Sequence, residues 1–294
     1  MTAKPRIGFI GLGLMGNAAT KFLVTEGYGV TGYDIVADKV AAAEANGIRG
    51  AASPAEVTQE SDIVICCVTS TAAVEEAVLG PGGVIETGTP DKVLVDISTT
   101  VTDKTREMAE RLARECGMKW VDAPVSGGPP AAGTGTLAIM AGGDDAAIAQ
   151  VSGVMNDLAA TFTHMGPVGA GQITKMINQV LVLTNYCVLA EALRLAEKGG
   201  IDAAKIPAAL APGHAGSNML QSIYPRMLER DFAPAGYARQ VLKDLDMVHD
   251  LAKDLKAPTP MASQAAALFR LLVARGHGEL DGIAVLKLYD DEPV

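Results

Sequence analysis

Aromatic residues are scarce in this chain of 294 residues, which contains five Phe, six Tyr and one Trp. Proteins that bind single-stranded nucleic acid stack bases on aromatic rings, so this scarcity argues against such a function. The charge balance agrees, because 24 Lys and Arg against 34 Asp and Glu give a net charge of −10. The basic residues also form no cluster, and we expect no nucleic-acid partner.

Cysteine and histidine are also few, with four of each. No CxxC pair, HExxH motif or Cys/His cluster occurs, so the spacing predicts no metal site. Cysteines without a pairing pattern indicate reduced thiols and a cytoplasmic protein. The residues are Cys66, Cys67, Cys116 and Cys187, with His164, His214, His249 and His277.

Long apolar runs are absent too. The longest uncharged stretch, residues 123–143, holds six glycines and three prolines, and we expect no membrane-spanning helix there. Residues 4–19 superficially resemble a secretory signal, with Lys4 and Arg6 ahead of an apolar run. Four glycines at fixed spacing in that run favour a different motif.

The first half of the chain alternates short apolar runs with helix-like stretches, which predicts a parallel sheet with helices on both faces. Residues 53–56 (SPAE) form a capping box that starts a further helix. We expect strands at 6–10, 29–33, 62–68, 93–97 and 119–122, a short strand within 133–143, and helices at 17–26, 35–46, 71–79 and 101–116.

The second half reads differently. Residues 169–198 contain no proline and carry apolar residues at helical intervals, which predicts a rod about 45 Å long. Residues 202–289 are helical, with proline and glycine breaks and no strand pattern. We therefore predict an α/β domain over residues 1–165 and an all-helical domain over 166–294, the latter beginning with a long interdomain helix.

A glycine-rich turn follows the first predicted strand and opens a helix. It reads Gly11-Leu12-Gly13-Leu14-Met15-Gly16. In this βαβ context the pattern favours dinucleotide binding, with the pyrophosphate at the helix N-terminus. A glycine-rich turn without a ligand is the alternative.

Asp34 ends the second predicted strand, 18 residues beyond Gly16. An acidic residue there accepts hydrogen bonds from the adenosine ribose and repels a 2′-phosphate. Ile35 offers no compensating positive charge, so we predict NAD rather than NADP as cofactor. Asp34 would also cap the next helix, a role compatible with the first.

Two further segments carry chemistry. Ser126-Gly127-Gly128 follows a strand and offers a hydroxyl and successive backbone N–H groups to an anion such as a carboxylate. A simple turn that binds no ligand has the same sequence pattern and is the alternative. On the long helix, Lys175 and Asn178 share one face with Gln179. A lysine beside an amide suits acid/base work, whereas a solvated lysine is the ordinary alternative.

Together these segments resemble the β-hydroxyacid dehydrogenase family, which includes 3-hydroxyisobutyrate dehydrogenase and tartronate semialdehyde reductase. The resemblance covers nearly the whole chain. It rests on residues 8–16 (GFIGLGLMG), 122–128 (DAPVSGG), 169–178 (GAGQITKMIN) and 243–245 (KDL).

The resemblance implies a Rossmann-type NAD(P)-binding domain followed by a helical domain through which the chain forms a homodimer or homotetramer. It implies that Lys175 is the catalytic acid/base and that Asn178 helps to hold the substrate. Ser126, Gly127 and Gly128 would bind the substrate carboxylate. The residues next to the cofactor would be Gly11, Leu12, Gly13, Leu14, Met15, Gly16, Asp34, Val68, Thr99 and Lys243. Gln179 and Thr69 depart from the family pattern, since many members have Asn and Pro there.

We therefore expect an NAD-dependent enzyme that interconverts a β-hydroxy acid and its semialdehyde or keto acid. A non-catalytic nucleotide-binding paralogue and an imine reductase are the alternatives, and Lys175 argues against both. A full-length 6-phosphogluconate dehydrogenase would be longer. The sequence leaves 3-hydroxyisobutyrate, glycerate, threonate, serine and 4-hydroxybutyrate open as substrates.

Overall fold

The computed structural model describes residues 4–290. The chain divides into two compact units, Met1–Lys175 and Met176–Val294, which we describe separately. The division falls inside the long helix α8 (Ala170–Lys198), whose first turn is hydrogen-bonded to Asp122 of the first unit. Our predicted domain boundary, between residues 165 and 166, lies just before this helix.

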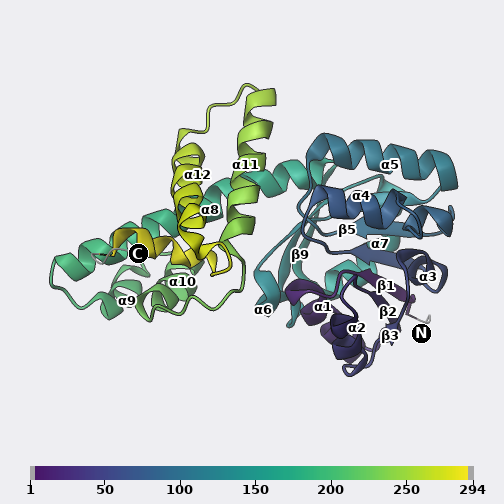
Figure 1. Cartoon of the computed structure of the whole chain (residues 1–294), viewed down its shortest axis with the longest axis horizontal. Coiled ribbons are helices and arrows are strands. Elements are labelled where there is room, and N and C mark those ends of the chain that lie inside the picture. The colour runs from purple at the N-terminus through teal and green to yellow at the C-terminus, as the bar shows by residue number, and fades with distance from the viewer. Residues whose placement is uncertain (1–3, 291–294) are drawn as a thin grey trace. The chain divides into compact units, whose positions relative to one another are not determined.

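The first unit is built on a nine-stranded sheet (Figure 1). Its first part contains six parallel strands in the order β3-β2-β1-β4-β5-β6. Parallel strands buried on both faces must be apolar throughout, and β4 (sequence IVIC) is fully buried. The strands are β1 (Ile7–Ile10), β2 (Val30–Tyr33), β3 (Arg49–Gly50), β4 (Ile63–Cys66), β5 (Val93–Asp96) and β6 (Lys119–Asp122).

The rest of the sheet extends the predicted parallel sheet with antiparallel pairing. Strand β8 (Leu137–Gly142), the short strand expected within residues 133–143, runs antiparallel to β6 and to the short β7 (Val125–Ser126). Strand β9 (Ala159–Gly166) then pairs parallel with β8 and was not predicted. Most of its side chains are exposed, so it lacks the apolar run that marked the other strands.

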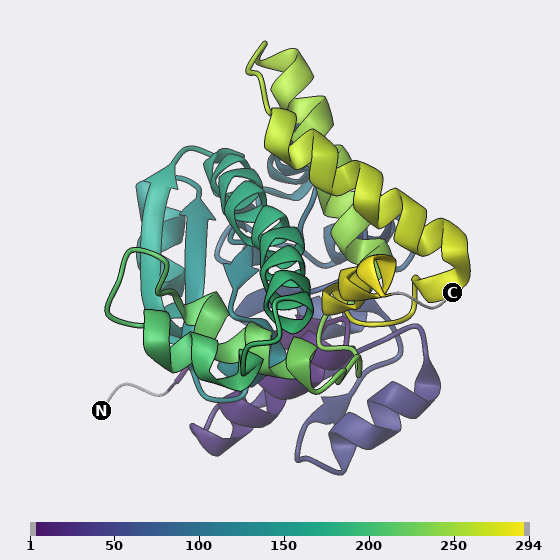
Figure 2. The same cartoon turned by 90° about the vertical axis from the view of Figure 1, so that its left-hand side faces the viewer.

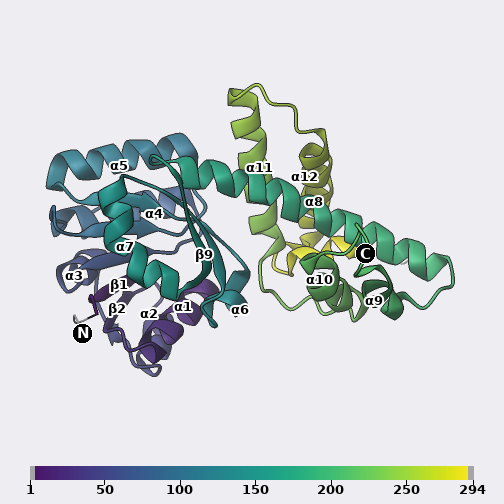
Figure 3. The same ribbon diagram turned by 180° about the vertical axis from the view of Figure 1, so that it is seen from behind.

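Helices cover both faces of this sheet (Figures 1 and 3). Helices α1, α2 and α7 contribute to one core, and α3, α4 and α5 to the core on the opposite face. The helices are α1 (Leu14–Thr25), α2 (Ala37–Glu44), α3 (Pro54–Gln59), α4 (Thr71–Leu79), α5 (Thr102–Cys116), α6 (Gly128–Ala132) and α7 (Asp145–Asp157), with a 3-10 turn η1 (Val84–Glu86).

The second unit contains only helices and turns among its described residues, apart from an isolated bridge between Tyr237 and Asp281. Its core gathers buried side chains from α8, α10, α11, α12 and η4, and α11 and α12 lie side by side as a hairpin (Figure 2). The elements after α8 are η2 (Ala203–Lys205), α9 (Ile206–Leu210), α10 (Asn218–Leu228), α11 (Ala238–Asp254), α12 (Pro260–Leu272), a π-helical turn η3 (Val273–His277) and a 3-10 helix η4 (Gly282–Tyr289).

The predicted fold class, an α/β dinucleotide-binding domain followed by a helical domain, is confirmed. One helix in the described part of the chain, α8, is long and apolar enough to cross a membrane by length and composition alone. Core helices of soluble proteins pass the same test, and α8 buries Leu183, Ala190 and Leu193 in the core of the second unit.

Candidate active site

The turn after β1 holds three glycines for three different reasons. Gly11 has a φ of 96°, and a Cβ there would lie 2.1 Å from the carbonyl oxygen of Cys67. A Cβ on Gly16 would lie 1.9 Å from the carbonyl oxygen of Gly11. At Gly13, however, a Cβ would meet no protein atom within 4 Å. Packing inside the protein does not require a glycine at position 13, so the absence of a side chain there leaves open space beside the turn.

Helix α1 begins directly above this turn. Its N-cap is Gly13, no side chain caps it, and its first turn contains no acidic residue. The first N–H groups of a helix lack partners within the helix and carry a partial positive charge. This helix end is therefore suited to bind an anion such as a pyrophosphate.

Asp34 follows β2 and lies beside the turn, almost fully buried. One carboxylate oxygen accepts the N–H of Leu12 at 2.8 Å, and the other accepts the N–H of Val36 at 2.9 Å. The carboxylate thus holds the glycine turn against the start of α2, while its remaining lone pairs are available to ribose hydroxyls.

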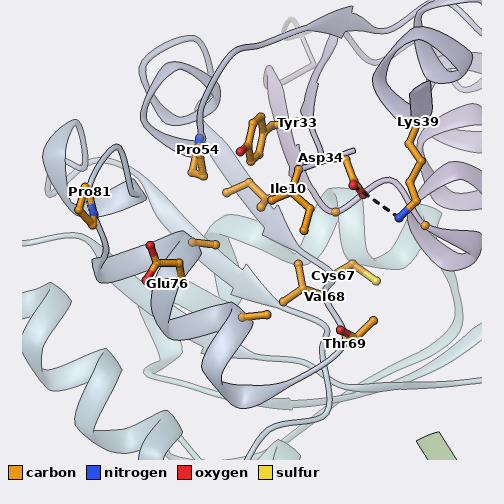
Figure 4. Close-up of a pocket in the computed structure, with 15 residues that line it drawn as sticks. Ile10, Tyr33, Asp34, Lys39, Pro54, Cys67, Val68, Thr69, Glu76 and Pro81 are labelled. Carbon is orange, nitrogen blue, oxygen red and sulfur yellow. Dashed lines mark hydrogen bonds and ion pairs between the residues drawn. The ribbon is translucent and has the colours of Figure 1, made fainter. Parts of the chain in front are cut away.

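Lys39 is a residue that the sequence analysis missed. Its Nζ lies 3.5 Å from Asp34 Oδ1, and its side chain lines the same pocket (Figure 4). Ile35, between them in sequence, is 88% exposed. A positive charge therefore stands next to the carboxylate that we expect to select the cofactor.

These residues border a pocket of about 390 Å³ in the first unit. Figure 4 shows Asp34 and Lys39 at one end and Glu76 and Pro81 at the other. Apolar side chains line the space between, which suits a flat apolar ring. The lining residues are Ile10, Gly11, Gly13, Tyr33, Asp34, Ile35, Lys39, Pro54, Cys67, Val68, Thr69, Ala73, Glu76, Ala77 and Pro81.

The geometry therefore fits the adenosine diphosphate half of a dinucleotide. The apolar slot would hold the adenine, Asp34 the ribose, and the open space at Gly13 the pyrophosphate. Cys67 also lines the slot, but burial raises the pKa of its thiol to about 12, so it is no nucleophile at neutral pH.

The strands next to β1 end close to this pocket. Val68 and Thr69 follow β4 and line it, and the N–H of Val68 donates to Ser98 Oγ at 2.9 Å. Thr99 follows Ser98 after β5 and is partly buried. Ligands of open α/β sheets bind beyond the carboxyl ends of the strands, which is where these residues lie.

The Ser126-Gly127-Gly128 segment is a tight turn that connects β7 and α6. Gly127 has a φ of 122° and Gly128 a φ of 69°, both rare for residues with a side chain. A Cβ on Gly127 would also lie 2.6 Å from that of Ala131. Glycine is therefore required by the backbone here, whatever the segment binds.

Lys175 lies on α8 and is only 7% exposed, which excludes the ordinary alternative of a solvated surface lysine. Its Nζ donates to the carbonyl oxygen of Val125 at 2.7 Å. Val125 directly precedes Ser126, so the lysine amine is held beside the start of the glycine turn. A buried, oriented amine at this position can transfer a proton to or from a molecule bound beside the turn.

The remaining predicted residues lie in the second unit and form a chain of hydrogen bonds. Asn178 Nδ2 donates to Gln179 Oε1 at 2.9 Å, and Gln179 Nε2 donates to Asp244 Oδ2. Lys243 Nζ lies 3.1 Å from Asp244 Oδ1. Asp244 thus fixes the orientation of Gln179, and Gln179 that of Asn178.

The structure brings together part of the predicted cofactor set. Gly11, Gly13, Asp34 and Val68 line the pocket, and Leu12 contributes its N–H to Asp34. Leu14, Met15 and Gly16 form the first turn of α1, Thr99 lies outside the pocket lining, and Lys243 belongs to α11 of the second unit.

The apolar lining of the pocket was not predicted. Pro54 opens α3, while Ala73 and Ala77 lie on α4, and both helices begin at a serine whose side chain caps them. Those caps were the available signal, since they place both helix starts at the carboxyl edge of the sheet. Among residues 4–290, no group of three or more His, Cys, Asp or Glu side chains could hold a metal ion.

Comparisons with known proteins agree with this geometry. A family profile described as the NAD binding domain of 6-phosphogluconate dehydrogenase matches residues 6–166. Another, described as NAD-binding of NADP-dependent 3-hydroxyisobutyrate dehydrogenase, matches residues 169–289. The fold and the pocket therefore define a dinucleotide-binding oxidoreductase.

Individual relatives narrow the class. A probable 3-hydroxyisobutyrate dehydrogenase-like protein of Arabidopsis thaliana is 38% identical, covering 95% of this chain and 85% of the relative. The 2-hydroxy-3-oxopropionate reductase of Escherichia coli is 35% identical, covering 96% of each chain. The crystal structure of 3-hydroxyisobutyrate dehydrogenase from Salmonella typhimurium aligns with a TM-score of 0.88 at 29% identity, covering 97% of this chain and 100% of the other. The chain belongs to the NAD-binding β-hydroxyacid dehydrogenase family.

Proposed function

We propose that this protein is an NAD-dependent dehydrogenase that interconverts a β-hydroxy acid and its semialdehyde or keto acid, with Lys175 as the acid/base. The observation that carries the proposal is the buried Lys175 amine, held by the Val125 carbonyl at the start of the Ser126 turn. Family membership supports the class of reaction, and the relatives named above differ in the hydroxy acid that they are named for.

In this proposal the first unit holds the cofactor. Backbone N–H groups at the start of α1, from Gly13 to Gly16, bind the pyrophosphate, and Asp34 binds the adenosine ribose. We further expect Val68, Thr99 and Lys243 to contact the cofactor when it is bound. A bound NAD would supply the acceptor for the hydride that leaves the hydroxyl-bearing carbon of the substrate.

The substrate is bound through its carboxylate and its hydroxyl. Ser126, Gly127 and Gly128 offer a hydroxyl and backbone N–H groups to the carboxylate, and Asn178 supplies a further amide. Neutral Lys175 takes the hydroxyl proton as the hydride leaves, and in reduction its ammonium returns that proton to the developing alkoxide. Oxidation should therefore become faster as pH rises, and reduction should be faster near neutrality.

We also propose a cytoplasmic homodimer or homotetramer. Helix α8 exposes Ile177, Leu181, Val188 and Leu195 to solvent in the single chain. Leu181, Val188 and Leu195 are spaced by seven residues and therefore share one face of the helix. Apolar stripes of this kind on a helix mark a surface that packs against another protein chain.

The test is a panel of hydroxy acids with NAD, followed by the appearance of NADH. The panel contains 3-hydroxyisobutyrate, glycerate, threonate, serine and 4-hydroxybutyrate, each compared with its methyl ester. We expect turnover of at least one acid and of no ester. A protein that binds NAD but oxidises none of these acids would contradict the proposed reaction.

A further inference from the structure

Gln172, in the first turn of α8, is completely buried and uses both ends of its side-chain amide. Its Nε2 donates to the carbonyl oxygen of Ser98 at 2.9 Å. Its Oε1 accepts the N–H of Thr100 at 3.0 Å. Ser98 and Thr100 are the two neighbours of Thr99, so one side chain from α8 fixes the backbone on both sides of that threonine.

The main chain of the same turn is tied to β6. Asp122, the last residue of β6, accepts the N–H of Gln172 at 2.9 Å through one carboxylate oxygen. Its other oxygen accepts the N–H of Gly169 at 2.7 Å. Asp122 therefore caps the start of α8. The backbone N–H of Gln172 is bonded to β6, while its side chain is bonded to the loop after β5.

This bonding extends to the edge of the cofactor pocket. Ser98 accepts the N–H of Val68 through its hydroxyl, and Val68 lines the pocket. Three loop or helix segments, those that carry Val68, Thr99 and Lys175, are thus joined through Ser98 and Gln172. Lys175 lies three residues after Gln172, so both side chains project from neighbouring positions on the same side of α8.

We propose that Gln172 is a positioning residue that fixes the loop carrying Thr99 against the helix carrying Lys175. The amide thereby sets the spacing between the loop that carries Thr99 and the proton-transferring amine of Lys175. The inference rests on the proposed function, because it assumes that Lys175 is the acid/base. Gln172 does not line the pocket, and both ends of its side-chain amide bond to backbone atoms, so it acts through these segments and not on the substrate.

Glutamine is needed at this position because one end of the side chain must donate a hydrogen bond to the Ser98 carbonyl and the other must accept one from the Thr100 N–H. Methionine has a similar length, but it would leave the Ser98 carbonyl and the Thr100 N–H buried without partners, which is unfavourable. Proton and hydride transfer depend steeply on geometry, and a misplacement of about 1 Å can lower a rate by about a hundredfold.

The experiment compares Gln172→Met with wild type in kcat, KM, NAD dissociation constant and the isotope effect of substrate deuterated at the reacting carbon. Gln150→Met is the matched control, because Gln150 also donates to a backbone carbonyl, that of Asp91, but on the exposed surface. We expect Gln172→Met to lower kcat by about ten- to a hundredfold. KM and NAD affinity should change little, and the isotope effect should increase. The control should resemble wild type.

A second variant covers the case in which Gln172→Met does not fold. In Gln172→Glu, a protonated carboxyl can donate to Ser98 and accept from Thr100 as the amide does, whereas the carboxylate cannot donate. The charged groups around this position are the buried Asp96 and Asp122 and, beyond Gly169, Arg106, whose Nε donates to the carbonyl of Val168. We expect the reductase activity of Gln172→Glu, relative to wild type, to fall as pH rises.

A Gln172→Met variant with the kcat of wild type would overturn the positioning role. A Gln172→Glu variant whose reductase activity, relative to wild type, does not change with pH would also overturn it. So would a parallel loss of kcat and NAD affinity, since that describes a general disturbance of the fold. Failure of the proposed function looks different, because Lys175→Ala would then keep its turnover, or wild type would oxidise no acid of the panel.

Discussion

Asp96 is a carboxylic acid with no exposed surface at the end of β5. Desolvation raises its pKa to about 7, although the N–H of Ser98 and the hydroxyl of Thr100 donate to it. Burial also raises the pKa of Asp122 to about 6. Two buried acids next to the cofactor side of the fold thus titrate near physiological pH.

This arrangement predicts how stability depends on pH. A pKa raised above the unfolded value of 3.8 means that the folded protein binds the proton more tightly. The stabilisation is complete below pH 3.8 and is lost as pH rises through about 7. Since one pKa unit corresponds to about 1.4 kcal/mol, Asp96 can lower the free energy of unfolding by up to about 4 kcal/mol across that range.

Asp96→Asn removes the titrating group while keeping its shape. As pH rises from mildly acidic to mildly alkaline, we expect the free energy of unfolding to decrease less in this variant than in wild type. Urea unfolding at each pH measures it. Asp103→Asn, at an exposed position on α5, is the control and should follow wild type. A wild-type pH dependence in Asp96→Asn would contradict the account.

Cofactor selection also depends on single residues. The carboxylate of Asp34 should repel a 2′-phosphate, whereas the ammonium of Lys39, 3.5 Å away, should attract it. We expect wild type to prefer NAD in kcat/KM, Lys39→Ala to increase that preference, and Asp34→Ala combined with Ile35→Arg to narrow or reverse it. Lys21→Ala, on an exposed position of α1, should leave the ratio unchanged. A wild-type enzyme that prefers NADP would refute this assignment.

At the scale of elements, the sequence predicted most accurately the strands that are buried on both faces of the sheet. The strands β1 and β4 are uniformly apolar, β5 is apolar up to its last residue, Asp96, and each was placed within a few residues. Strand β9 was missed because most of its side chains are exposed and its sequence, AATFTHMG, contains no continuous apolar run. Helix α2 begins at Ala37 and not at residue 35, because Asp34 accepts the N–H of Val36 and holds that turn outside the helix.

The site could be predicted only where a motif carries a backbone requirement. The glycine turn and Asp34 follow from such a motif, and both border the pocket. Lys39, Glu76 and Pro54 reach the same pocket from three different helices. The serine caps of α3 and α4 mark where those two helices begin, but they do not show that the three side chains converge on one pocket. Gln172 is similar, since only the fold shows that its amide meets Ser98 and Thr100.

The turn between β7 and α6 gives a prediction for substrate binding. Substitution at Gly127 would strain the backbone, so Ser126→Ala is the cleaner change. Loss of one hydroxyl donor to a carboxylate should raise the substrate KM by about tenfold, since hydrogen bonds to charged groups contribute about 1.5–3 kcal/mol. NAD affinity, measured by fluorescence titration, should be unchanged. Equal KM values in Ser126→Ala and wild type would argue against a carboxylate at this turn.

At the scale of the whole molecule, the single chain leaves an apolar stripe on α8. Leu181 is 63% exposed and Leu195 is 77% exposed. If α8 packs against a second copy, Leu181→Glu combined with Leu195→Glu should shift the protein toward the 30.3 kDa monomer, measured by light scattering at micromolar concentration. Leu255→Glu, an equally exposed position at the end of α11, is the control. A wild-type protein that is already monomeric would exclude the proposed assembly.

The account as a whole depends on Lys175, and its substitution is the most direct measurement. Lys175→Ala should lower kcat by at least the 10²- to 10⁴-fold that is typical of a general acid/base, with NAD affinity and folding unchanged. Lys92→Ala is the matched control, because Lys92 also donates to backbone carbonyls but precedes β5 at the opposite end of the strands. If Lys175→Ala kept more than about a tenth of the wild-type turnover, Lys175 would not be the acid/base and the proposed mechanism would be wrong.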